Sequence, residues 1–135
     1  MNKLRGCITA IESNDHVSLV DVDVNGDSFS ATLLETPEDA PYLKVGNLVD
    51  VLFKETEVSL AKNLSGLISI RNRVKAKVVL VRSGIILSEV VLDYSGLSIS
   101  SIITTRSIKR LEIKPGDEVE AMVKANEVTL MEVMN

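Results

Sequence analysis

Hydrophobic and polar residues alternate in short runs along this chain, and turn residues separate the runs. Residues 16–24 alternate, Asn25-Gly26-Asp27 interrupts the pattern, and 29–34 resumes it. Asn-Gly between two alternating runs is a strong hairpin signal. Further runs cover 4–11, 48–53 and 57–61. The pattern therefore predicts about five short strands in the first sixty residues.

The same pattern returns 70 residues later without a gap. Alternating runs cover 73–82, 85–94, 97–104, 119–124 and 127–133. Identical pairs at this offset include Gly26 and Gly96, Gly46 and Gly116, Ser28 and Ser98, and Ser30 and Ser100. Such a register indicates two copies of one unit. We predict a first unit over 1–62, a linker over 63–68 and a second unit over 69–135.

An irregular excursion follows the third predicted strand of each unit. Residues 35–41 contain two prolines and leave room for no more than one helical turn, whereas 105–111 has no proline and predicts a short helix. Lys114-Pro115-Gly116-Asp117 fits a type II turn. The predicted fold class is therefore mainly all-β, with two tandem five-stranded barrels, each closed by its own strands and each carrying a short helical excursion.

The composition and charge of the chain argue against some classes of function. Hydrophobic residues make up 45% of the chain but aromatic residues only 3%, so the cores must consist of Val, Ile and Leu. Units of this size are marginal alone, which predicts contacts between units and a homo-oligomer. A net charge of −4 without a basic block argues against nucleic acid, and no run is long enough to predict a membrane span. The single cysteine fits a reducing cytoplasm.

Anion binding is better supported than catalysis. One His and one Cys cannot form an ordinary metal cluster, and no nucleophile motif is present, so we expect no enzyme. Ser69, Arg71, Thr104 and Lys124 are hydroxyls and cations at the ends of predicted strands. Such groups hold tetrahedral oxyanions through charge-assisted hydrogen bonds. Arg71 and Lys124 stand at the two ends of one unit, where a closed barrel brings first and last strands together.

The opening of the second unit, Ser69-Ile70-Arg71-Asn72, resembles the Ser-Ala-Arg-Asn opening of Mop-type molybdate-binding domains, also called TOBE domains. Residues 111–119 and 123–130 resemble two later segments of the same family. The resemblance covers 67–133 and, more weakly, 1–62. It implies a tandem (di-Mop) pair of OB-like barrels that assembles into oligomers and binds molybdate or tungstate between units.

The resemblance also implies a ligand set in the second unit. The implied oxyanion-binding residues are Ser69, Ile70 through its backbone, Arg71, Thr104, Lys124, Ala125 and Asn126. Two of these positions depart from the family pattern: Ile70 replaces the usual Ala, and Asn126 stands where small or hydroxyl residues are common.

The first unit departs further from the pattern. It lacks the Ser and Arg of the opening motif, and Leu34 occupies the position of Thr104. Lys54 is retained, but Glu55 replaces Ala125 and puts a negative charge where an anion would sit. We therefore predict that the first unit builds no full site by itself, with Lys54 and Thr56 as secondary contributors to a shared one.

Three functions remain open at this point. The leading one is cytoplasmic binding of molybdate or tungstate for storage or homeostasis. The second is an oxyanion-sensing regulatory module that acts through a protein partner. The third, an OB-type nucleic-acid binder, is disfavoured by the acidic balance and by the scarcity of aromatic residues for base stacking.

Overall fold

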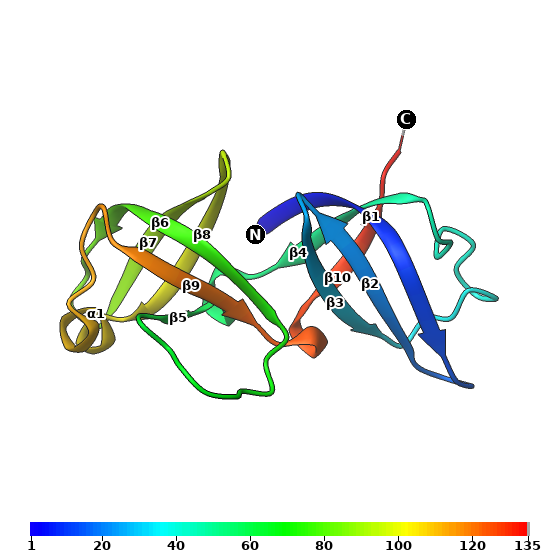
Figure 1. The fold of residues 1–135 in the computed structure, drawn as a ribbon, viewed down its shortest axis with the longest axis horizontal. Coiled ribbons are helices and arrows are strands. Elements are labelled where there is room, and N and C mark those ends of the chain that lie inside the picture. Colours follow the sequence, from blue (N-terminus) through cyan, green and yellow to red (C-terminus); the bar gives the residue numbers. More distant parts are fainter. Residues whose placement is uncertain (135) are drawn as a thin grey trace.

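The computed structural model describes residues 1–134 of the chain, so Asn135, the last residue of the predicted second unit, lies outside the described part. Two antiparallel five-stranded sheets lie side by side and give an elongated molecule (Figure 1). The first contains β10-β4-β1-β2-β3 and the second β5-β9-β6-β7-β8, in that order across each sheet. The strands are β1 (Asn2–Ser13), β2 (Ser18–Val24), β3 (Asp27–Leu33), β4 (Leu48–Phe53), β5 (Ser59–Ala61), β6 (Asn72–Arg82), β7 (Leu87–Tyr94), β8 (Leu97–Thr104), β9 (Glu118–Val123) and β10 (Thr129–Glu132).

Alternation determines which side chains enter the core. In β2, Val20, Val22 and Val24 are fully buried, while the residues between them face outward. The β2–β3 turn has positive φ at both central residues, 56° at Asn25 and 91° at Gly26. Positive φ at both of these positions is what a two-residue hairpin with a type I′ turn requires. The all-β prediction and the Asn-Gly hairpin are confirmed.

The two excursions differ as their prolines predict. Residues 105–111 form the helix α1 (Thr105–Leu111), which buries Ile108 against the sheet. Residues 35–41 instead form a turn, in which the N–H groups of Asp39 and Ala40 both donate to the Thr36 carbonyl. The expectation of a helical excursion in each unit is therefore wrong for the first unit. Pro41 lacks the N–H that would continue a helix there.

The last strand of each sequence unit lies in the sheet of the other unit. β5 pairs with β9, placing Leu60 opposite Ala121, and β10 pairs with β4. The expectation that each unit closes a barrel with its own strands is wrong. After β4 and β9 the chain makes a 3-10 turn, η1 (Glu55–Glu57) or η2 (Ala125–Glu127), which packs against β8 or β3 of the other unit. The boundaries at 62 and 69 remain a prediction about the sequence repeat.

The exchange joins the two sheets into one body. All the buried hydrophobic residues of both units except Ala61 and Met122 form one continuous cluster. A further link is the Tyr94 hydroxyl of the second unit, which is buried and donates to the Val24 carbonyl at 3.0 Å and to the Asp27 carboxylate of the first. The two units are therefore held in one fixed relation.

Candidate functional site

Two predicted ligand segments lie at the same edge of the second sheet. Residues 69–71 run directly into β6, and residues 124–126 follow directly after β9. Asn72 at the start of β6 pairs with Val123 at the end of the antiparallel β9. Arg71 and Lys124 come next on the two strands, so they are neighbours. We call residues 69–71 and 124–126 the second-unit edge; it contains every predicted ligand of this unit except Thr104.

Backbone N–H groups at this edge are uncommitted. Among the turn and loop hydrogen bonds of residues 1–134, none has its N–H donor between 64 and 71. Lys124 begins η2 without a side-chain cap. The N–H groups of Ala125 and Asn126 therefore have no partner within the turn. Such N–H groups, together with the Ser69 hydroxyl, suit an oxyanion.

The second-unit edge also carries two uncompensated cations. Arg71 and Lys124 are exposed, and neither takes part in an ion pair among the described residues. Arg73, two residues along β6, is instead held by Glu120 through contacts of 2.8 and 3.1 Å, and these hydrogen bonds lower the pKa of Glu120. Glu120 neutralises Arg73, so the positive charge at this edge comes from Arg71 and Lys124.

Asn72 fixes this edge against the other unit. Its side chain is 1% exposed, donates to the Ser30 carbonyl at 2.9 Å and accepts from the Ser30 N–H at 2.7 Å. The Ser30 hydroxyl is committed to Asp21, at 2.7 Å. We call these two hydrogen bonds from an asparagine side chain to the backbone of a serine in the other unit an asparagine lock. Sequence reasoning missed it, because the contact between the two units follows from the strand exchange, which the sequence did not predict. The identity of Ser30 and Ser100 at the repeat offset was the available signal.

The equivalent first-unit edge, formed by Met1, Asn2 and residues 54–56, has the same lock but a different charge. The Asn2 side chain donates to the Ser100 carbonyl at 2.9 Å and accepts from the Ser100 N–H at 2.8 Å. Glu55 stands at the repeat position of Ala125 and forms an ion pair with the Met1 amino group. The hydrogen bond within this ion pair lowers the pKa of the Glu55 carboxyl. A carboxylate thus already occupies the place of an anion.

A cavity of about 530 Å³ opens at the first-unit edge. Its lining includes two carboxylates, Glu55 and Glu89. The secondary candidates Lys54 and Thr56 are exposed on either side of Glu55, where Lys54 begins η1. Lys3 and the Met1 amino group line the same cavity and offset these carboxylates, so the cavity carries no excess of positive charge that would attract a dianion.

Thr104 lies at the opposite end of the second sheet. It ends β8, pairs with Leu87 and caps α1, where its hydroxyl accepts from the Ser107 N–H at 3.1 Å. β7 places this end of the sheet beside the last residue of β6, because Arg82 pairs with Glu89. Arg71 precedes the first residue of β6. A single chain therefore does not bring Thr104 to the second-unit edge.

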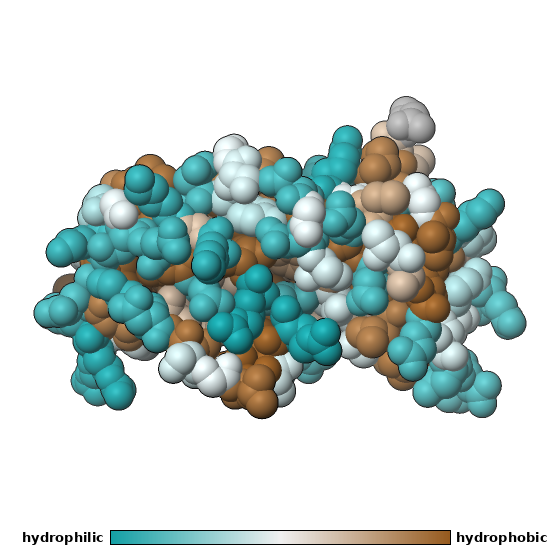
Figure 2. Space-filling view, in the orientation of Figure 1, coloured by the Kyte–Doolittle hydropathy of each residue, from teal (hydrophilic) through white to brown (hydrophobic). Residues whose placement is uncertain are grey.

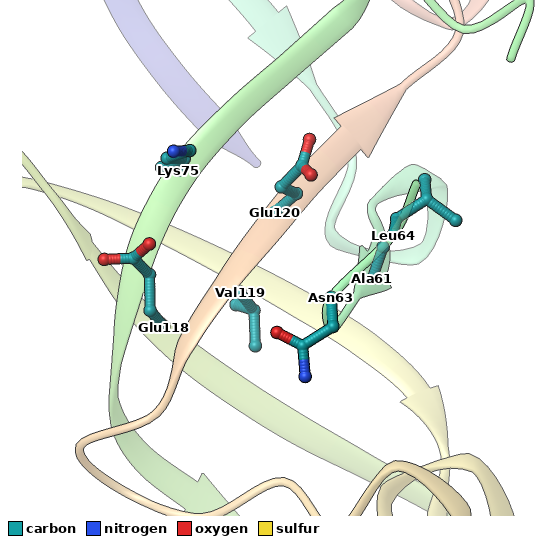
Figure 3. A pocket seen from close by; sticks show the side chains of 7 residues that line it. All are labelled: Ala61, Asn63, Leu64, Lys75, Glu118, Val119 and Glu120. Carbon is teal, nitrogen blue, oxygen red and sulfur yellow. The ribbon is translucent and has the colours of Figure 1, made fainter. Parts of the chain in front are cut away.

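A different cavity, of about 200 Å³, lies between the linker, β6 and β9 (Figure 3). Glu118 and Glu120 of β9 and Lys75 of β6 line one side, and Asn63 and Leu64 of the linker the other. Two carboxylates against one amine make it a poor anion site.

Within residues 1–134, His, Cys, Asp and Glu side chains do not gather in threes in a way that could hold a metal ion. No helix in that span is long and apolar enough to cross a membrane.

Comparisons with known proteins show which proteins this chain resembles. The TOBE domain model matches residues 68–130. Molybdenum-pterin-binding proteins 1, 2 and 3 of Clostridium pasteurianum are each 42% identical to this chain over 65 residues, which is 47% of this chain and 96% of each relative. A structure of the cytoplasmic molybdate-binding protein ModG, with molybdate bound, matches with a TM-score of 0.91 at 29% identity, over 98% of this chain and 96% of that one.

Proposed function

This chain belongs to the tandem Mop/TOBE family of molybdate-binding proteins, and from that premise we propose that it binds molybdate at the second-unit edge. The single observation that carries the proposal is the meeting of Arg71 and Lys124, two cations without carboxylate partners, beside free backbone N–H groups. The protein is a binding protein and not an enzyme.

The chemistry of the edge suits a tetrahedral dianion. Arg71 and Lys124 supply charge, and Ser69 supplies a hydroxyl donor. The N–H groups of Ile70, Ala125 and Asn126 add neutral donors whose positions the strand ends and η2 fix. Hydrogen bonds to a charged acceptor are about twice as strong as neutral ones, so each donor adds to affinity. Tungstate has the same charge and shape and is expected to bind as well.

Thr104 belongs to the proposed site only through a second copy of the chain. It is exposed and lies at the far end of the sheet, so its hydroxyl can reach an oxyanion at the edge of a neighbouring molecule. We therefore place the site between units of a homo-oligomer. The first-unit edge contributes at most Lys54 and Thr56, because Glu55 opposes an anion there.

The proposed role is cytoplasmic storage or homeostasis of molybdate. The relative that matches along the whole chain is described as a cytoplasmic molybdate-binding protein, which supports the compartment. An oxyanion-sensing role through a protein partner stays a prediction. Nucleic-acid binding loses its physical basis, because Phe29, Phe53 and Tyr94 are at most 3% exposed and only Tyr42 is partly accessible for stacking.

Calorimetric titration with molybdate, tungstate and sulfate tests the proposal. We expect heat from the first two ions and little from sulfate. Arg71→Ala or Lys124→Ala should weaken molybdate binding by roughly 10- to 100-fold, because each removes a charge-assisted contact.

Lys44→Ala, an exposed cation in a first-unit turn, is the matched control and should bind like wild type. Lys54→Ala measures the secondary contribution and should change affinity less than Lys124→Ala. No heat with any oxyanion, or equal losses in all four variants, would contradict the proposed site.

A further inference from the structure

Lys62, the last residue before the linker, is fastened to the second unit by three contacts. Its ammonium group donates to the Leu111 carbonyl at 3.2 Å and to the Glu112 carbonyl at 3.0 Å, and it pairs with the Asp117 carboxylate at 3.0 Å. Only 27% of the Lys62 side chain and 15% of the Asp117 side chain are exposed. We call these three contacts the Lys62 clamp. The clamp holds the chain at the point where it leaves β5.

The clamp supplies a donor that the second unit lacks at the end of α1. The last carbonyls of a helix have no hydrogen-bond partner within it. In the first unit, the Asn47 amide donates at 3.0 Å to the carbonyl of Tyr42, the repeat equivalent of Glu112. The second unit has Asp117 in place of Asn47, and a carboxylate only accepts hydrogen bonds. Lys62 provides both the donor and the opposite charge, and its hydrogen bond lowers the pKa of the Asp117 carboxyl.

The chain between the Lys62 clamp and Asn72 is held mainly at its two ends. Among the turn and loop backbone hydrogen bonds of residues 1–134, none has a donor or an acceptor in residues 63–71. Figure 1 shows this loop leaving the sheet between β5 and β6. Leu64 and Ile68 are each 39% exposed and Leu67 is fully exposed, and Figure 2 shows apolar side chains at the outer rim of the loop.

The loop carries three of the proposed ligand residues. Ser69, Ile70 and Arg71 are its last residues before Asn72. The cavity of about 200 Å³ lies between the linker and the strands β6 and β9, so the loop gains little support from packing against the sheet (Figure 3). Flexible backbone that becomes ordered on binding loses conformational entropy, which lowers affinity. An anchor at the start of the loop shortens the segment that the ion must order.

The two anchors stand at opposite ends of one strand. Asp117, in the clamp, directly precedes β9, and Asn72 pairs with Val123, the last residue of β9. Lys124 follows Val123 directly. The loop is therefore fixed at both ends relative to the strand that carries the other half of the proposed site.

We propose that Lys62 is a positioning residue for oxyanion binding, whose clamp holds the linker so that residues 69–71 stand beside Lys124. The inference rests on the proposed function, because it concerns the same edge. Lys62 is not itself a ligand, since its ammonium group is bound to Leu111, Glu112 and Asp117. It acts through the course of the loop.

Calorimetric titration with molybdate tests the effect on affinity. Lys62→Met keeps the apolar stem and removes the donor and the charge. It should weaken molybdate binding by roughly tenfold, which corresponds to ordering about one further backbone residue when the ion binds. Lys62→Arg keeps charge-assisted donors and should bind within about threefold of wild type. Arg82→Met, which removes the ion pair with Glu89 at the far end of β6, is the matched control and should bind like wild type.

Asp117→Asn separates positioning from stability. It installs the first-unit residue, whose amide can donate to the Glu112 carbonyl as Asn47 donates to Tyr42, so the melting temperature should stay close to wild type. Lys62 loses its charged partner, so molybdate binding should fall nearly as far as in Lys62→Met. In the double variant the two losses should not add, because both changes break the same clamp.

The mobility of the linker can be observed directly, because the chain contains no tryptophan. Leu67→Trp places a single indole at a fully exposed linker position. Without molybdate, its fluorescence anisotropy should fall when Lys62→Met is added, since the start of the loop is released. Saturating molybdate should raise the anisotropy of both proteins and bring the two values together.

The outcomes separate this inference from the proposed function. Wild type that binds no oxyanion contradicts the proposed function, and the anisotropy of the free protein then still tests the clamp. Lys62→Met with wild-type affinity overturns the positioning role. So does a loss of affinity that leaves the anisotropy of the free protein unchanged, or one that Lys62→Arg does not restore. If Lys62→Met does not fold, Asp117→Asn decides, and wild-type affinity in that variant overturns the inference.

Discussion

The first-unit and second-unit edges have the same pair of asparagine hydrogen bonds but differ in charge. Asn2 holds Ser100 through two hydrogen bonds, and Asn72 holds Ser30 through the equivalent two. What differs is the charge outside the lock. The second edge presents Arg71 beside an alanine, whereas Glu55 in the first is paired with the amino group of Met1.

The difference separates scaffold from site within one chain. A repeat conserves the contacts that build the fold, since loss of a buried polar partner is costly, but it leaves exposed side chains free to diverge. One unit can then keep the oxyanion ligands while the other supplies a supporting surface. The comparison predicts that only the second-unit edge of each chain binds the oxyanion. A change of exposed side chains alone, without any change in the backbone, should be enough to abolish binding at that edge.

The largest expected effect comes from moving the first unit's carboxylate into the second. Ala125→Glu should weaken molybdate binding by at least about 100-fold, because a fixed negative charge a few ångströms from a dianion costs several kcal/mol at an effective dielectric of about 20. Titration calorimetry measures the loss. Ala125→Gln has similar bulk without charge and should lose much less. If the two variants bind alike, size rather than charge distinguishes the edges.

The asparagine locks of Asn2 and Asn72 should contribute equally to the stability of the fold but unequally to molybdate binding. Asn72→Ala and Asn2→Ala each leave a backbone N–H and carbonyl unpaired, which should cost roughly 2 kcal/mol in the free energy of unfolding, measured in urea. Only Asn72→Ala should also weaken molybdate binding, because Asn72 positions Arg71. Equal binding losses in the two variants would make the first-unit edge part of the site.

The smallest expected effect concerns Tyr94, whose equivalent in the first unit is Val24. Burial, with the hydrogen bond to Asp27, raises the pKa of Tyr94 above its usual value. The folded state therefore holds this proton more tightly than the unfolded state, whose Tyr pKa is about 10. That contribution is present below pH 10 and is lost as pH rises beyond it.

Tyr94→Phe should accordingly cost about 1 kcal/mol at neutral pH and lose less stability than wild type above pH 10. Urea unfolding at pH 7 and at pH 10 to 11 measures both quantities. Tyr42, whose pKa burial and Glu35 raise to about 12, remains in the variant and keeps part of the alkaline loss. An unchanged alkaline slope would show that Asp27 and Tyr94 do not join the units in this way.

Local patterns predicted the strands, the Asn25-Gly26 hairpin and α1, because alternation, turn residues and the absence of proline act over a few neighbours. The exchange of β5 and β10 was not predictable in that way. A strand has the same alternation whether it pairs within its unit or across to the other. Sequence reasoning therefore placed Arg71 near Lys124 correctly for the wrong reason, since β6 and β9 are the neighbours and not the first and last strands of a closed barrel. Thr104 was grouped with them from family resemblance, and only the register shows that it lies at the other end of the sheet.

The strand exchange gives the linker a topological role. Each sheet needs a strand from both halves of the chain, so a chain with only one unit would have to recruit a second molecule to complete either sheet. Joining the halves replaces that encounter with an intramolecular one, at an effective concentration of roughly millimolar for a short connection. The fold of a single chain is then insensitive to dilution, and only the contacts between chains still depend on protein concentration.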